Sequence, residues 1–252
     1  MAAAKPTSVP APWLRLDPAI DPVVLAPVFA QHHRLHIPGV FAPGAAERIH
    51  GALVDGTPWR RNTVGSTGNQ SFYVNAYDQQ PAEWKAKLLE VIEAKARDGF
   101  QYLFDTYPVS DELEEGRRLG IACEAVYDFM NSEAGLEFLR RLTGEPRIAY
   151  VDAQCTRYLP GHFLTEHDDD LDGKHRLFAY VLNLTPQWRA DWGGLLLFLD
   201  ADGHVAEGYT PKFNALNIFK TPFPHCVTQV ASFAGAARYA ITGWIRACPP
   251  WG

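Results

Sequence analysis

Residues 157–169 read Arg157-Tyr158-Leu159-Pro160-Gly161-His162-Phe163-Leu164-Thr165-Glu166-His167-Asp168-Asp169. The residues up to Tyr158 favour a strand, and Pro160-Gly161 predicts a turn that ends it. His167 and Asp169 follow at positions i and i+2, and in an extended segment two such residues point to the same face. We therefore expect an imidazole and a carboxylate side by side near the end of a strand.

A second histidine completes a set of three metal ligands. His225 stands in Phe223-Pro224-His225, and we expect it on a strand paired across the mouth of a barrel. Two imidazoles and one carboxylate on one face of a metal leave the opposite face open, which is the ligand set of non-haem Fe(II) oxygenases. Because the chain has 9 His, the triad is a weak signal by itself and depends on the sequence around it.

The sequence after Pro146 is rich in short β-prone runs. Gly, Pro and Asp separate these runs, and residues 200–203, Asp-Ala-Asp-Gly, predict a hairpin turn. Many short strands at such intervals are typical of a sandwich or a barrel. The expected strands cover residues 148–151, 153–158, 177–182, 195–199, 216–219 and 238–244.

The first 145 residues have a different pattern. Residues 1–14 predict a flexible arm, and a short strand over 34–38 precedes a helix over about 43–54. Residues 56–80 are polar and aromatic, and they predict a loop or irregular hairpin of the kind that often carries binding. Helical spacing dominates from 81 to 143, and the expected helices there cover about 81–96, 110–130 and 133–142.

Composition indicates a soluble globular protein. Hydrophobic residues make up 47% of the chain and charged residues 21%, which argues against disorder. The net charge of -6 offers no basic face for nucleic acid, and no run approaches the ~20 apolar residues of a membrane span. The four Cys are far apart in the sequence, which argues against a zinc knuckle and against a disulfide framework. With no recognisable signal peptide, a cytoplasmic location is expected.

From about Ile148 to Arg246 the sequence resembles the prolyl 4-hydroxylase-like branch of the 2-oxoglutarate- and Fe(II)-dependent oxygenases. Several motifs in the family's order carry this resemblance, and together they are far more specific than the triad. They are Arg157-Tyr158-x-Pro160-Gly161, His167-x-Asp169, Tyr180-Val181-Leu182-Asn183, Trp188 with Trp192-Gly193-Gly194-x-Leu196, His225-x-Val227-x-x-Val230, and Arg238-Tyr239-Ala240-Ile241-Thr242-Gly243-Trp244.

The resemblance implies an α+β fold with a mainly β core. The core is a double-stranded β-helix, or jelly roll, with the N-terminal and central helices packed on one side. We expect a single domain over residues 1–252, in which 15–145 supply a strand, helical support and variable loops. Residues 146–247 then form the double-stranded β-helix core with the metal site.

The resemblance also implies roles for individual residues. It places Fe(II) on the catalytic ligands His167, Asp169 and His225, and the distal carboxylate of 2-oxoglutarate on Arg238, whose guanidinium fork matches a carboxylate. The interval from His225 to Arg238 is longer than is usual in the family, so a bulge or longer turn is expected over residues 227–237. The further residues implied around the cosubstrate are Tyr158, Tyr180 and Thr242.

The function implied is that of a 2-oxoglutarate-dependent dioxygenase that hydroxylates an aliphatic C–H, with Fe(II), 2-oxoglutarate and O2, and with ascorbate as a stimulant. The substrate implied is a prolyl-type residue in a protein or peptide. A free amino acid or another small molecule stays open as an alternative substrate, and the oligomeric state is left open. A non-catalytic jelly-roll binding module is a competing class, which the complete triad and the intact Arg238 disfavour.

Neighbours of the triad have simpler interpretations. Asp168-x-Asp170-x-Asp172-Gly173 begins like a calcium loop, but Ala179 stands where a bidentate Glu is needed. We interpret this cluster as a solvated loop at the mouth of the site. Arg176 is expected either to contact substrate or to pair with an Asp of the cluster. Gly193-Gly194 predicts a close backbone approach, and the nearby Trp188 and Trp192 are interpreted as packing residues.

Overall fold

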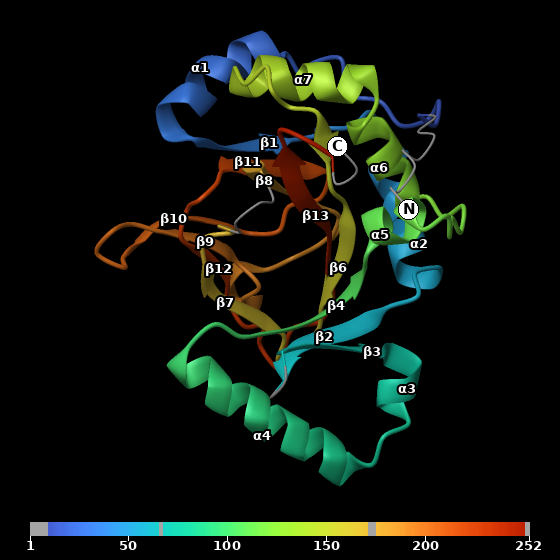
Figure 1. Cartoon of the computed structure of the whole chain (residues 1–252), viewed down its shortest axis with the longest axis vertical. Helices are drawn as coiled ribbons and strands as arrows, with labels where there is room; N and C mark the ends of the chain where they lie inside the picture. Colours follow the sequence, from blue (N-terminus) through green and yellow to red (C-terminus); the bar gives the residue numbers. More distant parts are fainter. Residues whose placement is uncertain (1–9, 66–67, 171–174, 250–252) are drawn as a thin grey trace.

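The computed structural model describes residues 10–65, 68–170 and 175–249. Its strands are β1 Arg34–Pro38, β2 Arg60–Gly65, β3 Gly68–Tyr73, β4 Tyr102–Tyr107, β5 Tyr150–Val151, β6 Gln154–Tyr158, β7 Phe163–His167, β8 Arg176–Asn183, β9 Leu196–Leu199, β10 Val205–Tyr209, β11 Ala215–Lys220, β12 His225–Val227 and β13 Arg238–Arg246. Ten of them follow one another through an antiparallel sheet in the order β1-β11-β8-β13-β6-β4-β7-β12-β9-β10 (Figure 1). The hairpin β2–β3 attaches through β4, and β5 attaches to β13.

The two ends of this strand order, β1 and β10, contact each other and nearly close the sheet into a barrel. Arg34 of β1 forms an ion pair with Glu207 of β10. The rings of His36 in β1 and Tyr209 in β10 lie 5.3 Å apart. The result is the double-stranded β-helix predicted from the sequence, with an interior that can hold a site.

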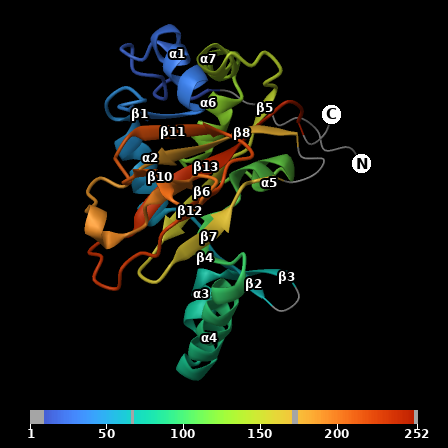
Figure 2. The ribbon, with the colours of Figure 1, turned by 90° about the vertical axis from the view of Figure 1, so that its left-hand side faces the viewer.

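Helices lie on the outer face of this barrel or in a lobe attached to it (Figure 1). They are α1 Pro22–His32, α2 Ala45–Asp55, α3 Val74–Asp78, α4 Ala82–Asp98, α5 Val109–Glu114, α6 Glu124–Met130 and α7 Glu133–Thr143, with a 3-10 turn at Ala190–Trp192. Elements α1, α2, α6 and α7 lie together on one side, as predicted (Figures 1 and 2). Leu182 and Ile241 belong to the core beneath these helices, whereas Val181 and Ala240 belong to an interior cluster. Strand alternation thus separates the two cores.

Helices α3 and α4 depart from the predicted packing of helices on one side. With the hairpin β2–β3 they form a lobe below the barrel (Figures 1 and 2). The hairpin falls within the loop or hairpin expected over 56–80, and Arg60 lies opposite Tyr73 in it. Only Ile92 of the 17 residues of α4 is buried, so the lobe has little core of its own. Within the described residues, no helix combines the length and apolar character needed to cross a membrane.

Two predictions for residues 100–130 are wrong. Residues 102–107 form strand β4 inside a region predicted to be helical. The single helix expected over 110–130 is two short helices, α5 and α6. Between them Gly116 and Gly120 have φ of 77° and 76°, a conformation that glycine adopts readily and that a helix does not contain.

The N-terminal part is also more ordered than predicted. Leu14, at the end of the expected arm, is 3% exposed and belongs to the core under the helices. Residues 1–9 lie outside the described residues. Helix α1 was not predicted, although its start has clear signals: the Asp21 side chain accepts a hydrogen bond from the Val23 amide, and Pro22 occupies the first helical position.

The remaining elements expected from the sequence are present. The strand over 34–38, the helix near 43–54 and the last helix near 133–142 appear as β1, α2 and α7, and the helix near 81–96 appears as α4. Every strand expected after residue 146 is found, β12 is the strand expected to carry His225, and β7 and β10 add to them. The barrel strands therefore follow the sequence pattern closely.

Candidate active site

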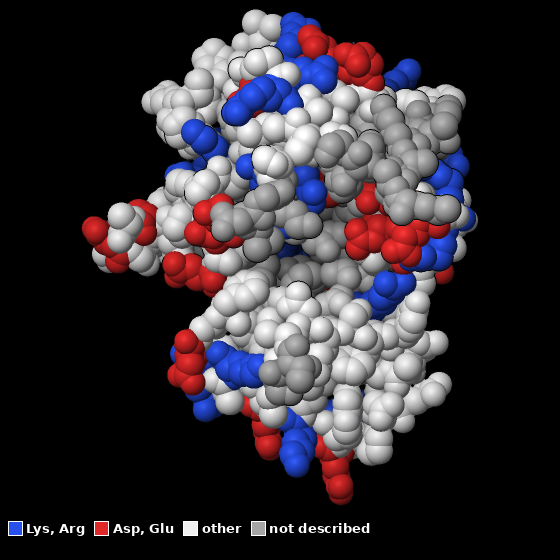
Figure 3. Space-filling view, viewed as in Figure 1, with Lys and Arg blue, Asp and Glu red and all other residues white. Residues whose placement is uncertain are grey.

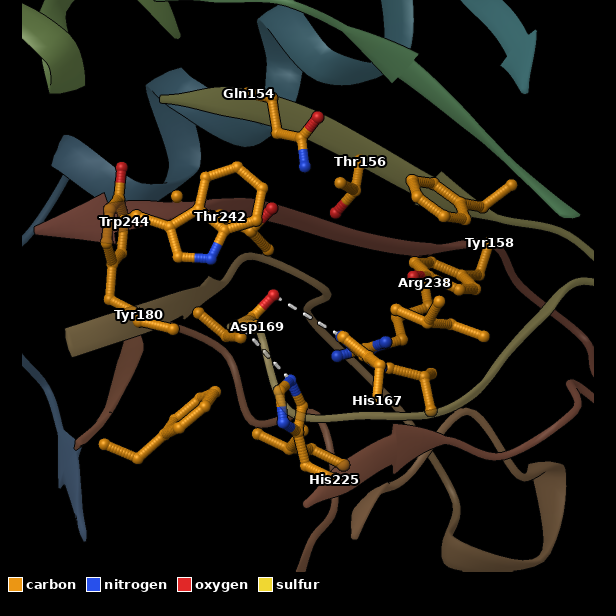
Figure 4. A pocket seen from close by; sticks show the side chains of 18 residues that line it. Gln154, Thr156, Tyr158, His167, Asp169, Tyr180, His225, Arg238, Thr242 and Trp244 are labelled. Atoms are coloured by element: carbon orange, nitrogen blue, oxygen red, sulfur yellow. Dashed lines mark ion pairs between the residues drawn. The ribbon is translucent and has the colours of Figure 1, made fainter. Parts of the chain in front are cut away.

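Three side chains converge at one end of the barrel interior (Figure 4). His167 ends β7 and His225 begins β12, and the two residues lie opposite each other in the strand pairing. Asp169 Oδ1 lies 3.7 Å from His167 Nε2, and Asp169 Oδ2 lies 3.4 Å from His225 Nε2. One ligand atom from each residue lies within 4.8 Å of the others. The structure therefore brings the three predicted metal ligands to a single point.

Asp169 reaches this point by a different route from the one predicted. Strand β7 ends at His167, and Asp169 has a left-handed φ of 66°. The two residues are therefore not an i, i+2 pair on one strand face. Arg176 Nη1 donates to the backbone carbonyl oxygen of Asp169 at 3.1 Å, and among the described residues it forms no ion pair with Asp168 or Asp170 of the cluster. Asp172 and Gly173 of that cluster lie outside the described residues.

Backbone carbonyls fix the orientation of both imidazoles. His167 Nδ1 bonds the Thr165 carbonyl at 3.0 Å, and His225 Nδ1 bonds the Phe223 carbonyl at 2.7 Å. A carbonyl only accepts, so each ring carries its proton on Nδ1 and turns the Nε2 lone pair toward Asp169. Burial, and then the neighbouring His167, lowers the pKa of His225 to about 4. The Nε2 atoms of both imidazoles thus face the Asp169 carboxylate, an arrangement of donors that a divalent cation satisfies.

The same cavity contains a buried cation. Arg238 of β13 is 2% exposed, lies opposite Tyr158 of β6, and has its Cζ 5.0 Å from the Tyr158 ring centroid. Its Nε has no hydrogen-bond partner, and no ion pair joins Arg238 to a carboxylate among the described residues. Burial lowers the pKa of Arg238, but an arginine stays charged in proteins. Since an unpaired buried charge is costly, this cavity fits an anion.

The other predicted cosubstrate residues line the cavity as well. Tyr158, Tyr180 and Thr242 surround it together with the triad and Arg238. The Tyr158 ring stacks on Phe104 with centroids 5.0 Å apart. The Tyr180 hydroxyl donates to the Asp152 carbonyl at 2.8 Å, so it has no proton left for a carboxylate. In this arrangement Tyr180 contributes a ring wall and an acceptor oxygen.

Sequence reasoning missed three polar residues of the cavity. Gln154, Thr156 and Trp244 line it, and the indole Nε1 of Trp244 is buried without a hydrogen-bond partner. Strand alternation was the signal that could have found them. Gln154 and Thr156 precede Tyr158 by four and two residues in β6, and Trp244 follows Thr242 by two residues in β13.

Two glycines make room beside Arg238, as the predicted close approach requires. Gly193 has φ of 68°, and a Cβ there would lie 2.0 Å from the Gln229 carbonyl oxygen. A Cβ on Gly194 would lie 3.3 Å from Arg238 Cδ. The indole of Trp188 donates to the Gly193 carbonyl at 2.9 Å, which agrees with a packing role. The connection from 228 to 237 is a loop without strand structure, the longer turn that was expected.

A second hollow opens on the far side of His167, at the junction of the barrel with the α3–α4 lobe. Phe100 lies there with 52% of its surface exposed, and its ring centroid is 5.7 Å from that of His167. Figure 3 shows the surface hollowed between the barrel and the lobe, with both acidic and basic side chains near its edges. The residues that line this groove include two carboxylates and no Lys or Arg, and they are Ala96, Gly99, Phe100, Thr165, Glu166, His167, Asp168 and Pro224.

Residues 153–246 match the family model described as the 2OG-Fe(II) oxygenase superfamily. The chain is 33% identical over 127 residues to prolyl 3-hydroxylase OGFOD1 of Xenopus laevis, and 32% identical over 142 residues to that of Mus musculus. These alignments cover 46% and 54% of this chain, but 24% and 25% of the relatives. The chain thus spans about a quarter of the length of the curated relatives it matches.

Solved structures share the fold at low sequence identity. A prolyl hydroxylase from Trichoplax adhaerens, in complex with a hypoxia inducible factor peptide fragment, superposes with a TM-score of 0.59 at 16% identity, covering 89% of this chain and 88% of that one. An oxidoreductase of the 2OG-Fe(II) oxygenase family from Burkholderia pseudomallei superposes with a TM-score of 0.57 at 13% identity, covering 93% and 94%. These likenesses confirm the predicted double-stranded β-helix.

Proposed function

We propose that this chain is a 2-oxoglutarate- and Fe(II)-dependent dioxygenase that hydroxylates an aliphatic C–H, and the match of residues 153–246 to the 2OG-Fe(II) oxygenase superfamily model supports the proposal. The observation that carries the proposal is one cavity lined by both the His167, Asp169 and His225 triad and the unpaired Arg238. The triad by itself suits many metalloproteins, and a buried cation suits many anions. Together they fit a cosubstrate that binds the metal at one end and presents a carboxylate at the other.

The residues of the cavity divide the binding work between them. His167, Asp169 and His225 would hold Fe(II) and leave other coordination positions open. When bound, iron and 2-oxoglutarate supply the oxidising chemistry: O2 is consumed, 2-oxoglutarate loses CO2 to give succinate, and one oxygen atom enters the substrate. Arg238 would bind the distal carboxylate through its guanidinium fork, and Tyr158 and Thr242 would offer hydroxyl groups beside it.

The proposed substrate is a prolyl-type residue in a protein or peptide. The relatives are named as prolyl 3-hydroxylases, and the surface groove beside His167 is the site proposed for the peptide. Phe100 offers an exposed aromatic face next to the metal ligands, and an aliphatic ring packs well on such a face. Glu166 and Asp168 at the same groove suit a peptide without acidic side chains at the target.

The conditions of the reaction belong to the same proposal. We propose that ascorbate stimulates turnover by keeping the iron ferrous, and that the protein works in the reducing cytoplasm. All four cysteines are free thiols, which fits such a compartment.

The cosubstrate is tested by titrating 2-oxoglutarate into the Mn(II)-loaded protein under anaerobic conditions. Arg238→Met should weaken 2-oxoglutarate binding at least about 10-fold, because a charged hydrogen bond contributes roughly 1.5–3 kcal/mol. Arg189→Met is the matched control, since Arg189 is 68% exposed and pairs only with Asp191 among the described residues. Absence of 2-oxoglutarate binding by the wild type would favour a non-catalytic binding module.

The reaction itself is tested with Fe(II), ascorbate, 2-oxoglutarate and a library of proline-containing peptides. Succinate formation that depends on a peptide, together with a product heavier by one oxygen atom, is the expected result. A free amino acid that supports turnover where no peptide does would move the substrate to the small-molecule class. Turnover that persists in both His167→Ala and Asp169→Ala would contradict the assignment of the metal site.

A further inference from the structure

Asp169 is held in a conformation that residues other than glycine adopt uncommonly, although Asp adopts it more often than most. Its φ of 66° lies in the left-handed region, where the Cβ of an L-residue approaches the following carbonyl oxygen. The Phe223 amide donates to the Asp168 carbonyl at 3.2 Å, so the residue before the turn is tied to the segment that leads into β12. A side chain that stabilises this turn would also decide where the Asp169 carboxylate lies relative to the two imidazoles.

Arg176, at the start of β8, contacts this turn from behind. Its Nη1 donates to the Asp169 carbonyl oxygen at 3.1 Å and lies 4.0 Å from Asp169 Oδ1. The side chain is 9% exposed, so it has little freedom to leave this position. One guanidinium group thus contacts both the backbone and the carboxylate of the residue whose position matters most.

Trp244 of β13 provides the surface on which the guanidinium rests. Arg176 Cζ lies 3.5 Å from the centroid of the indole ring, and a cation on the face of a Trp ring is attracted more strongly where water is excluded. Strands β8 and β13 are paired, with Trp244 opposite Ala179, so the platform is part of the barrel wall. Trp244 lines the cavity whereas Arg176 does not, which places the arginine behind the wall.

Other charges keep this buried arginine in balance. Asp152 lies near it and pairs with Arg246, whose Nε is 2.6 Å from Asp152 Oδ2. The carboxylates of Asp169 and Asp152 favour the charged form of Arg176, while burial and Arg246 oppose it, and the pKa of Arg176 is lowered from its usual value. The carboxylates of both Asp169 and Asp152 thus act electrostatically on Arg176.

We propose that Arg176, stacked on Trp244, is a positioning residue that holds the left-handed turn at Asp169 and thereby sets the carboxylate for metal binding. The inference rests on the proposed metal site. It assigns Arg176 to the metal end of the cavity and not to the cosubstrate carboxylate, which belongs to Arg238. Loss of Arg176 therefore weakens the metal site and leaves 2-oxoglutarate binding at saturating metal largely unchanged.

The experiment measures Mn(II) affinity by calorimetry for wild type, Arg176→Met, Arg176→Lys and Trp244→Leu. Partners that orient metal ligands typically contribute about 10–100-fold to affinity, and Arg176→Met should lose that much. Arg176→Lys should recover only part of the loss, because an ammonium group cannot both stack flat on an indole and donate through a fork. The double variant Arg176→Met with Trp244→Leu should lose no more than Arg176→Met, since the platform acts through the arginine.

Arg189→Met is the matched control and should bind Mn(II) like wild type, because its guanidinium pairs with Asp191 at the surface. Thermal unfolding of each metal-free variant separates loss of the fold from loss of the site. If Arg176→Met unfolds, Arg176→Lys and Trp244→Leu carry the test. Mn(II) affinity within about twofold of wild type in the folded variants overturns the inference. A wild type that binds Mn(II) but no 2-oxoglutarate refutes the proposed function and leaves the positioning role standing, whereas one that binds no Mn(II) refutes both.

Discussion

Asp168 and Asp169 are neighbours in sequence with different surroundings. Asp168 is exposed, and its Oδ1 accepts a hydrogen bond from the Asp170 amide at 2.9 Å. Asp169 faces both imidazoles. Asp169→Asn should therefore weaken Mn(II) binding by at least about 100-fold, more than loss of an orienting partner costs. Asp168→Asn should change it less than about threefold. Calorimetric titration with Mn(II) measures the affinity of both variants. Equal losses of affinity would mean that Asp168 and Asp169 can each serve as the metal ligand.

His162 is a second buried imidazole, and it is outside the metal site. It is 3% exposed, its Nδ1 has no hydrogen-bond partner, and burial lowers its pKa from 6.5 to about 4. Because the folded state disfavours the protonated ring, His162 contributes its full stability above pH 6.5 and loses it as the pH falls toward 4. The loss should amount to about 3 kcal/mol of unfolding free energy.

Urea unfolding of wild type and His162→Gln between pH 7.5 and 4 measures this contribution. The carboxylates and His225 titrate in both proteins, so the difference between the two stability curves isolates His162. That difference should shrink as the pH falls, since the variant has no imidazole to protonate. Two parallel curves would show that His162 is hydrated or protonated in the folded protein.

Backbone hydrogen bonds connect the segment from Thr228 to Ala231 both to residues 192–194 and to Gly161. Gly194 donates to the Thr228 carbonyl at 3.1 Å, the Ala231 amide donates to the Trp192 carbonyl at 2.9 Å, and Gly161 donates to the Val230 carbonyl at 2.8 Å. This element packs against the Gly193-Gly194 turn so closely that no side chain fits between them. The segment 228–231 therefore holds the Gly193-Gly194 turn in place next to Arg238.

Gly193→Ala should destabilise the protein by about 3 kcal/mol, from overpacking against the Gln229 carbonyl and from a left-handed φ. Gly203→Ala is the matched control, because Gly203 has φ of 78° in the β9–β10 turn but nothing within 4 Å of an added Cβ. Its cost should be about 1 kcal/mol. Urea unfolding compares the two variants. Similar losses of unfolding free energy would show that the segment 228–231 moves away from the added methyl group.

The sequence predicts elements well where one periodicity dominates. Strands β8, β11 and β13 are apolar runs bounded by turn residues, so their positions and the triad beside them could be anticipated. Strand β4 is buried at five of its six positions, so its sequence shows no alternation of apolar and polar residues. The prediction therefore did not separate it from the helical region around it. The break between α5 and α6 depends on Gly116 and Gly120. A prediction from the spacing of apolar residues alone does not take account of such glycines.

The turn at Asp169 is a feature that local sequence could not supply. A left-handed aspartate is uncommon, and this one is held by Arg176 from the next strand, which stacks on Trp244 from the far end of the chain. The residues of the triad were predictable from the motif, but the way in which they meet depends on tertiary contacts. Alternation along β6 and β13 would have extended the site to Gln154 and Trp244.

At the scale of the whole molecule, a tightly packed barrel carries a thinly packed lobe. The barrel has cores on both faces of its sheet, whereas α4 buries only Ile92. The lobe reaches the barrel through the pairing of β2 with β4 and borders the groove at Phe100. Segments with few buried contacts undergo local unfolding most readily. We therefore expect the barrel side of the groove to be rigid and the lobe side to be mobile.

Hydrogen exchange monitored by mass spectrometry should resolve this difference. Amides of α4 should exchange at least about 10-fold faster than those of β8 and β13, since opening the lobe exposes little apolar surface. Ile92→Ala removes its one fully buried side chain and should speed exchange in α4 further, while Val91→Ala, at a residue 42% exposed, should not. Exchange in β8 and β13, and Mn(II) affinity, should stay unchanged in both variants. If Ile92→Ala speeds exchange in the barrel strands as much as in α4, lobe and barrel unfold as one unit, and the groove cannot widen on the lobe side alone.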